Sequence, residues 1–150
     1  MVAAALVVLA AVALRLWVVE PFTVSSDSME PTIAAGSIVL IYKPATGAIG
    51  NGAVVAFTNP LDGHTAIKRV VAGEGQSVAI RDAELYVDDV LVAEPFVDHS
   101  RIDATYFGPV TVAAGSVFLL GDNRAVSIDS RDFGDIPVTS IEGIVLTAGK

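Results

Sequence analysis

The hydrophobic residues of the chain are unevenly distributed, and its first segment differs from everything that follows. Residues 1–19 (MVAAALVVLAAVALRLWVV) contain a single polar side chain, Arg15. A helix of this length rises about 28 Å, close to the hydrocarbon thickness of a bilayer. Arg15 lies near one end, where its side chain can reach the lipid headgroups, and Trp17 suits the membrane interface. The pattern predicts a transmembrane anchor over residues 1–19.

A cleaved signal peptide is the alternative interpretation of this segment. Such a peptide begins with a basic region and ends in a polar turn with a cleavage site. Here no Lys or Arg precedes the apolar run, and no polar turn separates it from the residues that follow. We therefore favour the anchor, although the charges give no orientation for it.

Beyond residue 20 the pattern changes to short apolar runs with a period of two, separated by Gly, Pro and Asn. Such runs predict β-strands, and no segment after residue 20 shows helical periodicity over three turns. The sequence therefore predicts a mainly β fold, in which an N-terminal transmembrane helix precedes a compact all-β domain, a sandwich or partly closed barrel, over residues 20–150. The expected strands lie within residues 36–43, 52–58, 65–72, 76–80 and 141–148, with a hairpin in 84–94 that turns at Asp88-Asp89 and two strands in 108–122.

The charge balance narrows what this domain can bind. All 17 acidic residues follow residue 19, together with eight of the nine basic ones, so residues 20–150 carry a net charge of −9. Nucleic acid is therefore not an expected partner, because no basic patch exists to meet phosphates. The chain contains no cysteine, which excludes disulfides, thiol catalysis and thiolate metal sites. His64 and His99 lack metal-ligand spacing, so no metal or other cofactor is expected.

Serine and lysine remain as candidates for catalysis. A serine hydroxyl needs a base to take its proton, and both histidines lie in polar, loop-like contexts without a G-x-S-x-G motif. Of the three lysines, Lys68 lies inside an apolar strand, where it shares a face with Ala66 and Val70. Burial lowers the pKa of a lysine, and a neutral lysine can act as a general base.

Each of these residues also has a structural interpretation. Lys68 can extend to the sheet edge and pair with a carboxylate, and periodicity alone favours that role. Ser28 can cap a helical turn that begins near Pro31, and Met29 can belong to the core. The pattern by itself leaves these alternatives open.

Four motifs occur in the order in which the bacterial type I signal peptidases carry them. They are SSDSMEPTI (25–33), GSIVLIYK (36–43), HTAIKRVVAGEGQSV (64–78) and VFLLGDNRAVSIDSRDFG (117–134). Between the last two, LYVDDVLVAEPF (85–96) resembles the hairpin of that family. The chain thus resembles these S26-type Ser/Lys proteases, or leader peptidases, over nearly its whole length.

The resemblance implies a serine endopeptidase that removes signal peptides from exported preproteins after A-x-A-like sites. It implies Ser28 as the nucleophile and Lys68 as the general base. It also implies that the hydroxyl of Ser26 helps to form the oxyanion hole, and that Ser127 hydrogen-bonds and orients the lysine amine. The remaining expected site residues are Met29, Ile33, Ala66 and Ile67 for substrate binding, and Gly121, Asp122, Asn123, Arg124, Asp129 and Arg131 for structural support, with Asp129 and Arg131 forming an ion pair.

The same resemblance implies partners and a location. The expected partners are the signal peptides of exported preproteins and membrane lipid, and a monomer is expected. The chain is expected to cross the cytoplasmic membrane once, with residues 20–150 on the extracytoplasmic side. It departs from the family pattern at Ala66, often an aromatic residue, and at Ala125 and Val126, which are often polar.

Three rival interpretations remain. A self-cleaving repressor-type Ser/Lys protease shares the dyad but is soluble, whereas this chain begins with an apolar segment. A membrane-anchored β-sheet binding module would need no catalytic residues. A Ser/His hydrolase would use His64 or His99 as its base.

Overall fold

The structure of the chain is a computed structural model that describes residues 7, 12, 18–43, 49–102 and 106–146. Within these residues the chain is built almost wholly of short strands. The strands are β1 (Val19–Thr23), β2 (Ile38–Tyr42), β3 (Val54–Thr58), β4 (Thr65–Gly73), β5 (Ser77–Arg81), β6 (Glu84–Val87), β7 (Val90–Leu91), β8 (Phe107–Thr111), β9 (Ser116–Leu120), β10 (Ile136–Pro137) and β11 (Ile141–Leu146). The helical elements are α2 (Ser130–Phe133) and the 3₁₀ turns η2 (His99–Arg101) and η3 (Val138–Ser140). The prediction of a mainly β domain is confirmed.

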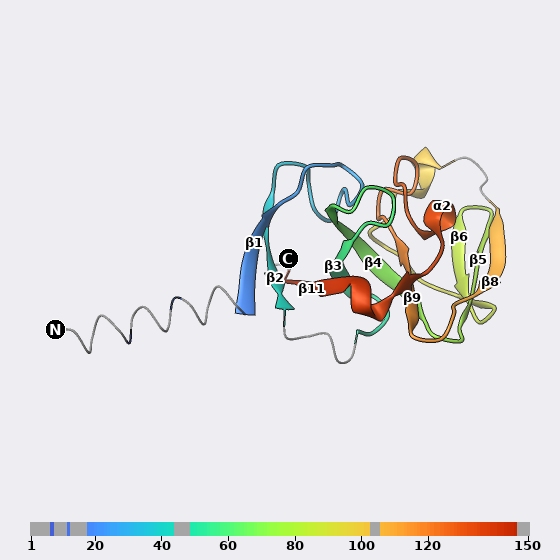
Figure 1. Cartoon of the computed structure of the whole chain (residues 1–150). Coiled ribbons are helices and arrows are strands. Elements are labelled where there is room, and N and C mark those ends of the chain that lie inside the picture. The colour runs from blue at the N-terminus through green and yellow to red at the C-terminus, as the bar shows by residue number, and fades with distance from the viewer. Residues whose placement is uncertain (1–6, 8–11, 13–17, 44–48, 103–105, 147–150) are drawn as a thin grey trace.

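The strands form two antiparallel sheets. The larger has seven strands in the order β1-β2-β11-β3-β4-β9-β10, and the smaller has four in the order β7-β6-β5-β8. Figure 1 shows β1 and β2 at one end of the molecule, β5, β6 and β8 at the other, and β3, β4 and β9 between them. The strand β4 therefore lies in the middle of the molecule.

Burial along the strands follows from their places in the sheets. In β2, Val39 and Ile41 are buried while Ile38 and Leu40 are exposed, the alternation of a strand with one face in the core. By contrast, β9 is buried along its whole length and is apolar from Val117 to Leu120. Each fully buried large apolar side chain contributes about 1.5–3 kcal/mol, so central strands such as β9 carry much of the stability.

The start of the domain differs from the prediction. The predicted anchor extends to residue 19, but Val19 begins β1, which pairs with β2 from Val19↔Tyr42 to Thr23↔Ile38. An edge strand tolerates Pro21, because a proline has no N–H to donate to a further strand. Apart from residues 7, 12, 18 and 19, the predicted anchor lies outside the described residues. Among the residues that are described, no helix is both long and apolar enough to cross a bilayer.

Two features of strand pairing could not be read from the sequence. The strands predicted within 108–122 belong to different sheets, because β8 pairs with β5 and β9 pairs with β4. Moreover, β4 pairs with β3 over Thr65–Arg69 but with β9 only from Arg69 onward. Among the described strands, the first half of β4 thus has a partner on one side and an open edge on the other.

Candidate active site

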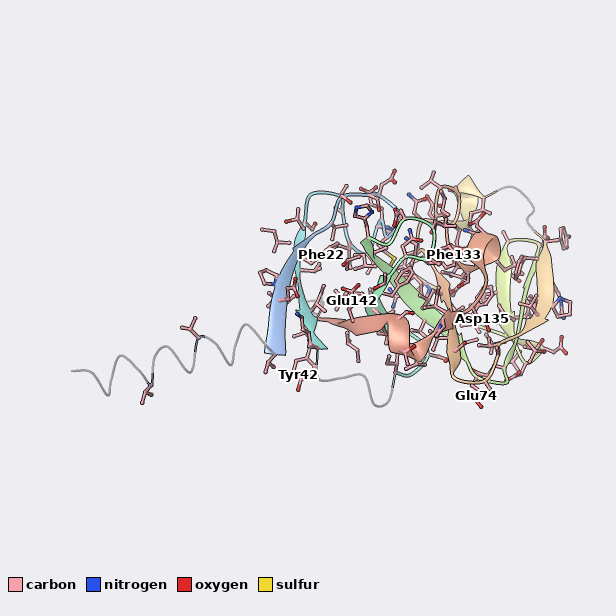
Figure 2. The ribbon with its side chains drawn as sticks, viewed as in Figure 1. Phe22, Tyr42, Glu74, Phe133, Asp135 and Glu142 are labelled. Atoms are coloured by element: carbon pink, nitrogen blue, oxygen red, sulfur yellow. The ribbon has the colours of Figure 1, made fainter. Side chains whose placement is uncertain are left out.

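A cleft of about 680 Å³ lies along the first half of β4. One wall is formed by residues 64–68 and another by residues 22–28, which include the end of β1 and the loop after it. Asn59, Asp62, Val126 and Ile128 complete the lining. Phe22, which lines one end of the cleft, is labelled in Figure 2 beside β1. The volume of the cleft is within the range of about 300–1,000 Å³ that is usual for ligand-binding clefts.

Ser28 and Lys68 meet at this cleft. Ser28 lies in a turn in which the Glu30 N–H donates to the carbonyl oxygen of Asp27 at 3.0 Å. Lys68 is the last residue of β4 before its pairing with β9 begins. Lys68 Nζ lies 2.8 Å from Ser28 Oγ and 3.2 Å from the carbonyl oxygen of Ile67. Ser28 and Lys68 are 6% and 5% exposed, so their contact is shielded from water.

The surroundings of Lys68 favour its neutral form. Burial lowers the pKa of the Lys68 amine below its ordinary value of 10.5, and the carboxylates of Asp129 and Asp122 offset only part of that change. Within the described part of the chain, Lys68 forms no salt bridge. An amine that is buried without a contacting carboxylate can accept a proton.

Ser26 lies beside the same pair. Its hydroxyl oxygen is 3.2 Å from Ser28 Oγ, and Ser26 lines the cleft. A hydroxyl at this distance can donate to an oxygen that is bound next to Ser28. His64 lines the cleft as well, but it lies near Asp62 (3.6 Å from Nδ1 to Oδ1), whereas the polar side chains bonded to the Ser28 hydroxyl in the described structure are Ser26 and Lys68.

Ser127 differs from its prediction in one respect. The expected hydrogen bond between Ser127 and the lysine amine is absent, and the buried Ser127 Oγ has no hydrogen-bond partner in the described structure. Ser127 nevertheless packs directly on Gly121. A Cβ on Gly121 would overlap the Ser127 hydroxyl and lie 2.6 Å from the carbonyl oxygen of Ser28. Only a glycine at position 121 leaves room here for both Ser127 and the carbonyl oxygen of Ser28.

Two ion pairs lie behind the site. Arg131 Nε donates to Asp129 at 2.8 Å, which is the ion pair that the resemblance implied, and Asp129 also accepts the N–H of Gly121 at 3.0 Å. Burial acts to lower the pKa of Arg131, but the hydrogen bond and charge of Asp129 outweigh it, and the pKa is raised. Arg69 makes two hydrogen bonds to Asp122, at 2.8 and 2.6 Å.

A third ion pair brings in a residue that was not predicted from the sequence. Arg124, expected to shape the loop, bonds Glu94 at 2.5 Å, and both side chains are almost wholly buried. The sequence contains one local indication that Glu94 is buried. It lies in the apolar stretch Ala93-Glu94-Pro95-Phe96, which is an unusual setting for a solvated charge. Asn123 holds the nucleophile turn from the same loop, because its N–H donates to the carbonyl oxygen of Ser28 and its side chain to that of Asp27.

The four residues expected to bind substrate divide into two pairs. Ala66 and Ile67 line the cleft. Met29 and Ile33 are 0% and 5% exposed and belong to a core cluster that also contains Ile67. The structure therefore places Met29 and Ile33 behind the cleft wall and not on its surface.

Comparison with known proteins agrees with this geometry. The sequence model of the family described as "Signal peptidase, peptidase S26" matches residues 1–148. The chain belongs to this family. Accordingly, it is a hydrolase, a serine protease that cleaves signal peptides, and the prediction of an enzyme is confirmed.

Several signal peptidases are similar to the chain over most of its length. It is 32% identical over 135 residues to "Signal peptidase I" of Bacillus licheniformis, with 83% of this chain and 73% of that protein covered. It is 34% identical over 143 residues to "Signal peptidase I V" of Bacillus subtilis strain 168, with 85% and 83% covered. The crystal structure of a signal peptidase I from Enterococcus faecalis V583 is similar at a TM-score of 0.59 and 31% identity, covering 65% of this chain and 96% of that one.

Proposed function

We propose that the chain cleaves signal peptides with a catalytic dyad of Ser28 and Lys68. The observation that carries the proposal is the 2.8 Å contact between Lys68 Nζ and Ser28 Oγ in a buried setting that lowers the pKa of the lysine. A Ser/Lys pair is an attested variant of the serine-protease triad. No second ionisable group is needed, because the lysine serves as base and then as acid.

The proposed reaction follows from this contact. Ser28 Oγ attacks the scissile carbonyl carbon while its proton passes to the neutral amine of Lys68. The Ser28 N–H and the Ser26 hydroxyl stabilise the oxyanion that forms, and each such donor contributes about 10²–10³ in rate. The Lys68 ammonium then protonates the leaving amine as the peptide bond breaks. Lys68, neutral again, deprotonates a water molecule that attacks the Ser28 ester. The ester bond breaks, the peptide leaves as a carboxylic acid, and the proton on Lys68 returns to Ser28 Oγ.

The substrate is proposed to bind as an added strand along the open edge of β4. Residues Thr65–Lys68 have a pairing partner on the β3 side only, among the described strands, and this edge faces the cleft. A peptide laid along it would receive main-chain hydrogen bonds, with alternate side chains directed into the cleft wall. Ala66 and Ile67 line the cleft beside this edge, where we propose that small side chains of an A-x-A-like site are bound.

The site is proposed to work at the extracytoplasmic surface of the cytoplasmic membrane, where residues 1–19 anchor the domain. An apolar face of β1, β2 and β11 supports this location. Pro21, Leu40 and Leu146 are aligned across the three strands by their register, and Leu40 and Leu146 are 45% and 48% exposed. Ile38, also on β2, is 71% exposed. Such a patch next to the apolar N-terminal segment suits contact with lipid.

Preprotein cleavage by the full chain in detergent tests the dyad. Ser28→Ala and Lys68→Ala should each lower kcat/KM by several orders of magnitude, on the scale seen when a serine-protease nucleophile or base is removed. The His64→Ala/His99→Ala double variant should cleave at a nearly normal rate. Substantial activity in Lys68→Ala, or its loss in the histidine variant, would reject the dyad.

A further inference from the structure

The buried pair of Glu94 and Arg124 joins two distant parts of the chain. Glu94 follows β7 in the smaller sheet, and its Oε1 lies 2.5 Å from Arg124 Nη2. The side chains are only 3% and 2% exposed. Arg124 belongs to the loop between β9 and α2, which also carries Gly121 and Ser127. The pair therefore connects the smaller sheet to the catalytic loop.

The pair is an inefficient way to stabilise the fold. Both charges lose their hydration when they are buried, and buried ion pairs are often no more stabilising than apolar side chains of similar volume. Here each partner also leaves one polar atom without a hydrogen bond in the described structure, namely Glu94 Oε2 and Arg124 Nη1. Stability alone therefore does not account for this pair, and its geometry has to be considered.

A second bond from the guanidinium shows what the geometry controls. Arg124 Nε donates to the carbonyl oxygen of Gly121 at 2.9 Å, while Nη2 of the same group binds Glu94. A Cβ on Gly121 would overlap both the Ser127 side chain and the carbonyl oxygen of Ser28, so both residues pack against this glycine. Any movement of Gly121 is consequently passed to the turn that carries Ser28.

Of the other two buried pairs, Arg69 and Asp122 connect the loop to β4, next to Lys68. Asp129 and Arg131 lie in the same segment as the catalytic loop, and they hold it through the N–H of Gly121 and the carbonyl oxygens of Arg124 and Ser127. Glu94 reaches the loop from the smaller sheet and, through Arg124, acts on the carbonyl oxygen of Gly121. Two residues further on, the ring of Phe96 lies 4.0 Å from the guanidinium carbon of Arg69, the neighbour of Lys68.

We propose that Glu94 is a positioning residue: by orienting Arg124 it fixes Gly121 and so sets the spacing between Ser28 and Lys68. The inference rests on the proposed dyad. A misplacement of about 1 Å far from the chemistry can lower a rate by about 10²-fold. Loss of Glu94 should thus lower kcat while leaving KM nearly unchanged, since Glu94 does not line the cleft.

The double variant Glu94→Leu/Arg124→Met separates geometry from stability. It removes both charges and fills their space with apolar groups, so its melting temperature should stay near that of the wild type. Its kcat for a preprotein should nevertheless be about 10²-fold lower. The rising limb of its pH profile should also move to higher pH, because a looser loop admits water to Lys68. Recovery of normal kcat together with normal stability would overturn the proposal.

Single variants keep the test decisive if the double variant does not fold. Glu94→Gln leaves the Arg124 cation without a charged partner, and Glu94→Asp keeps the charge on a shorter side chain. At temperatures where both are folded, kcat should fall most in Glu94→Gln and be partly restored in Glu94→Asp. A kcat and pH limb in Glu94→Gln that match the wild type would also overturn the proposal.

Two controls define what a failure means. Asp89→Asn removes the exposed ion pair of Asp89 with Arg81 and should leave kcat unchanged. Lys68→Ala is assayed in parallel with the Glu94 variants. Activity retained in Lys68→Ala rejects the dyad itself, whereas loss in Lys68→Ala with normal kcat in the Glu94 variants rejects only the positioning role.

Discussion

The basic side chains packed around the loop between β9 and α2 differ in their partners: the arginines are paired with carboxylates, and Lys68, within the described part of the chain, is not. On the cleft side, Lys68 bonds a serine hydroxyl and a backbone carbonyl, and no salt bridge to it occurs in the described residues. Next to it on β4, Arg69 makes two hydrogen bonds to Asp122. Behind the loop, Arg131 and Arg124 are bonded to Asp129 and Glu94.

The difference indicates how one small domain can contain both structural cations and a lysine suited to its proposed role as a base. A guanidinium stays charged when buried and needs a carboxylate partner, whereas a lysine responds to burial by losing its proton more easily. Asp122 and Asp129 raise the pKa of Lys68 from a distance, but their hydrogen bonds go to Arg69 and Arg131. The ion pairs thus keep the carboxylates of Asp122 and Asp129 out of contact with the Lys68 amine.

Replacing Lys68 should have the largest effect. Lys68→Met should lower kcat/KM for cleavage by a factor on the order of 10⁴ or more. The same substitution should nevertheless stabilise the fold. In the wild type, burial holds the folded pKa below the unfolded value of 10.5, so between these two values the unfolded chain binds more protons and stability rises with pH. Below the folded pKa the wild type carries the full cost, which is about 1.4 kcal/mol for each tenfold loss of proton affinity on folding.

Urea unfolding at a series of pH values checks this prediction. The advantage of Lys68→Met over the wild type should be largest below the folded pKa and should shrink as the pH approaches 10.5. A variant that is less stable than the wild type at every pH would mean that Lys68 acts as a stabilising partner and not as a strained base. The comparison with the arginines would then fail.

Removing the carboxylate partner of a buried arginine should destabilise the fold, unlike the replacement of Lys68. Asp129→Asn leaves Arg131 without its charged partner, which costs about 3–5 kcal/mol of stability for a buried pair. It also removes the charge that most strongly raises the pKa of Lys68, so that pKa should fall further. The rising limb of kcat/KM should move to lower pH, and a displacement to higher pH would show that Asp129 does not act on Lys68 through its charge.

Most strands were predictable because each apolar run fits a pleated, half-buried surface. The first strand was not, because the apolar residues Val18 and Val19 continue the pattern of the predicted anchor. The turn at Asp88-Asp89 was located correctly, and both residues have positive φ, as a two-residue hairpin turn of this kind requires. The assignment of each strand to one of the two sheets was not predictable, because it depends on contacts between residues far apart in the sequence.

The site was predictable only in part. The hydrophobic pattern was compatible with purely structural roles for Ser28 and Lys68. The family motifs favoured the catalytic interpretation, and in the structure Lys68 Nζ lies 2.8 Å from Ser28 Oγ. The expected hydrogen bond of Ser127 was wrong: Ser127 packs against Gly121, and its Oγ has no hydrogen-bond partner in the described structure. Glu94 was missed because a charge at the end of a hairpin is usually solvated, and only tertiary packing buries it.

The most direct test of the catalytic dyad is a titration of the Lys68 amine itself. The chain has three lysines, so carbon-13 signals from labelled lysine side chains can be assigned with Lys43→Arg and Lys150→Arg variants of the full chain in detergent. We expect Lys68 to titrate below 10.5, with a midpoint that coincides with the rising limb of kcat/KM. A Lys68 amine that titrates at or above 10.5 would contradict the claim that a neutral lysine takes the proton of Ser28.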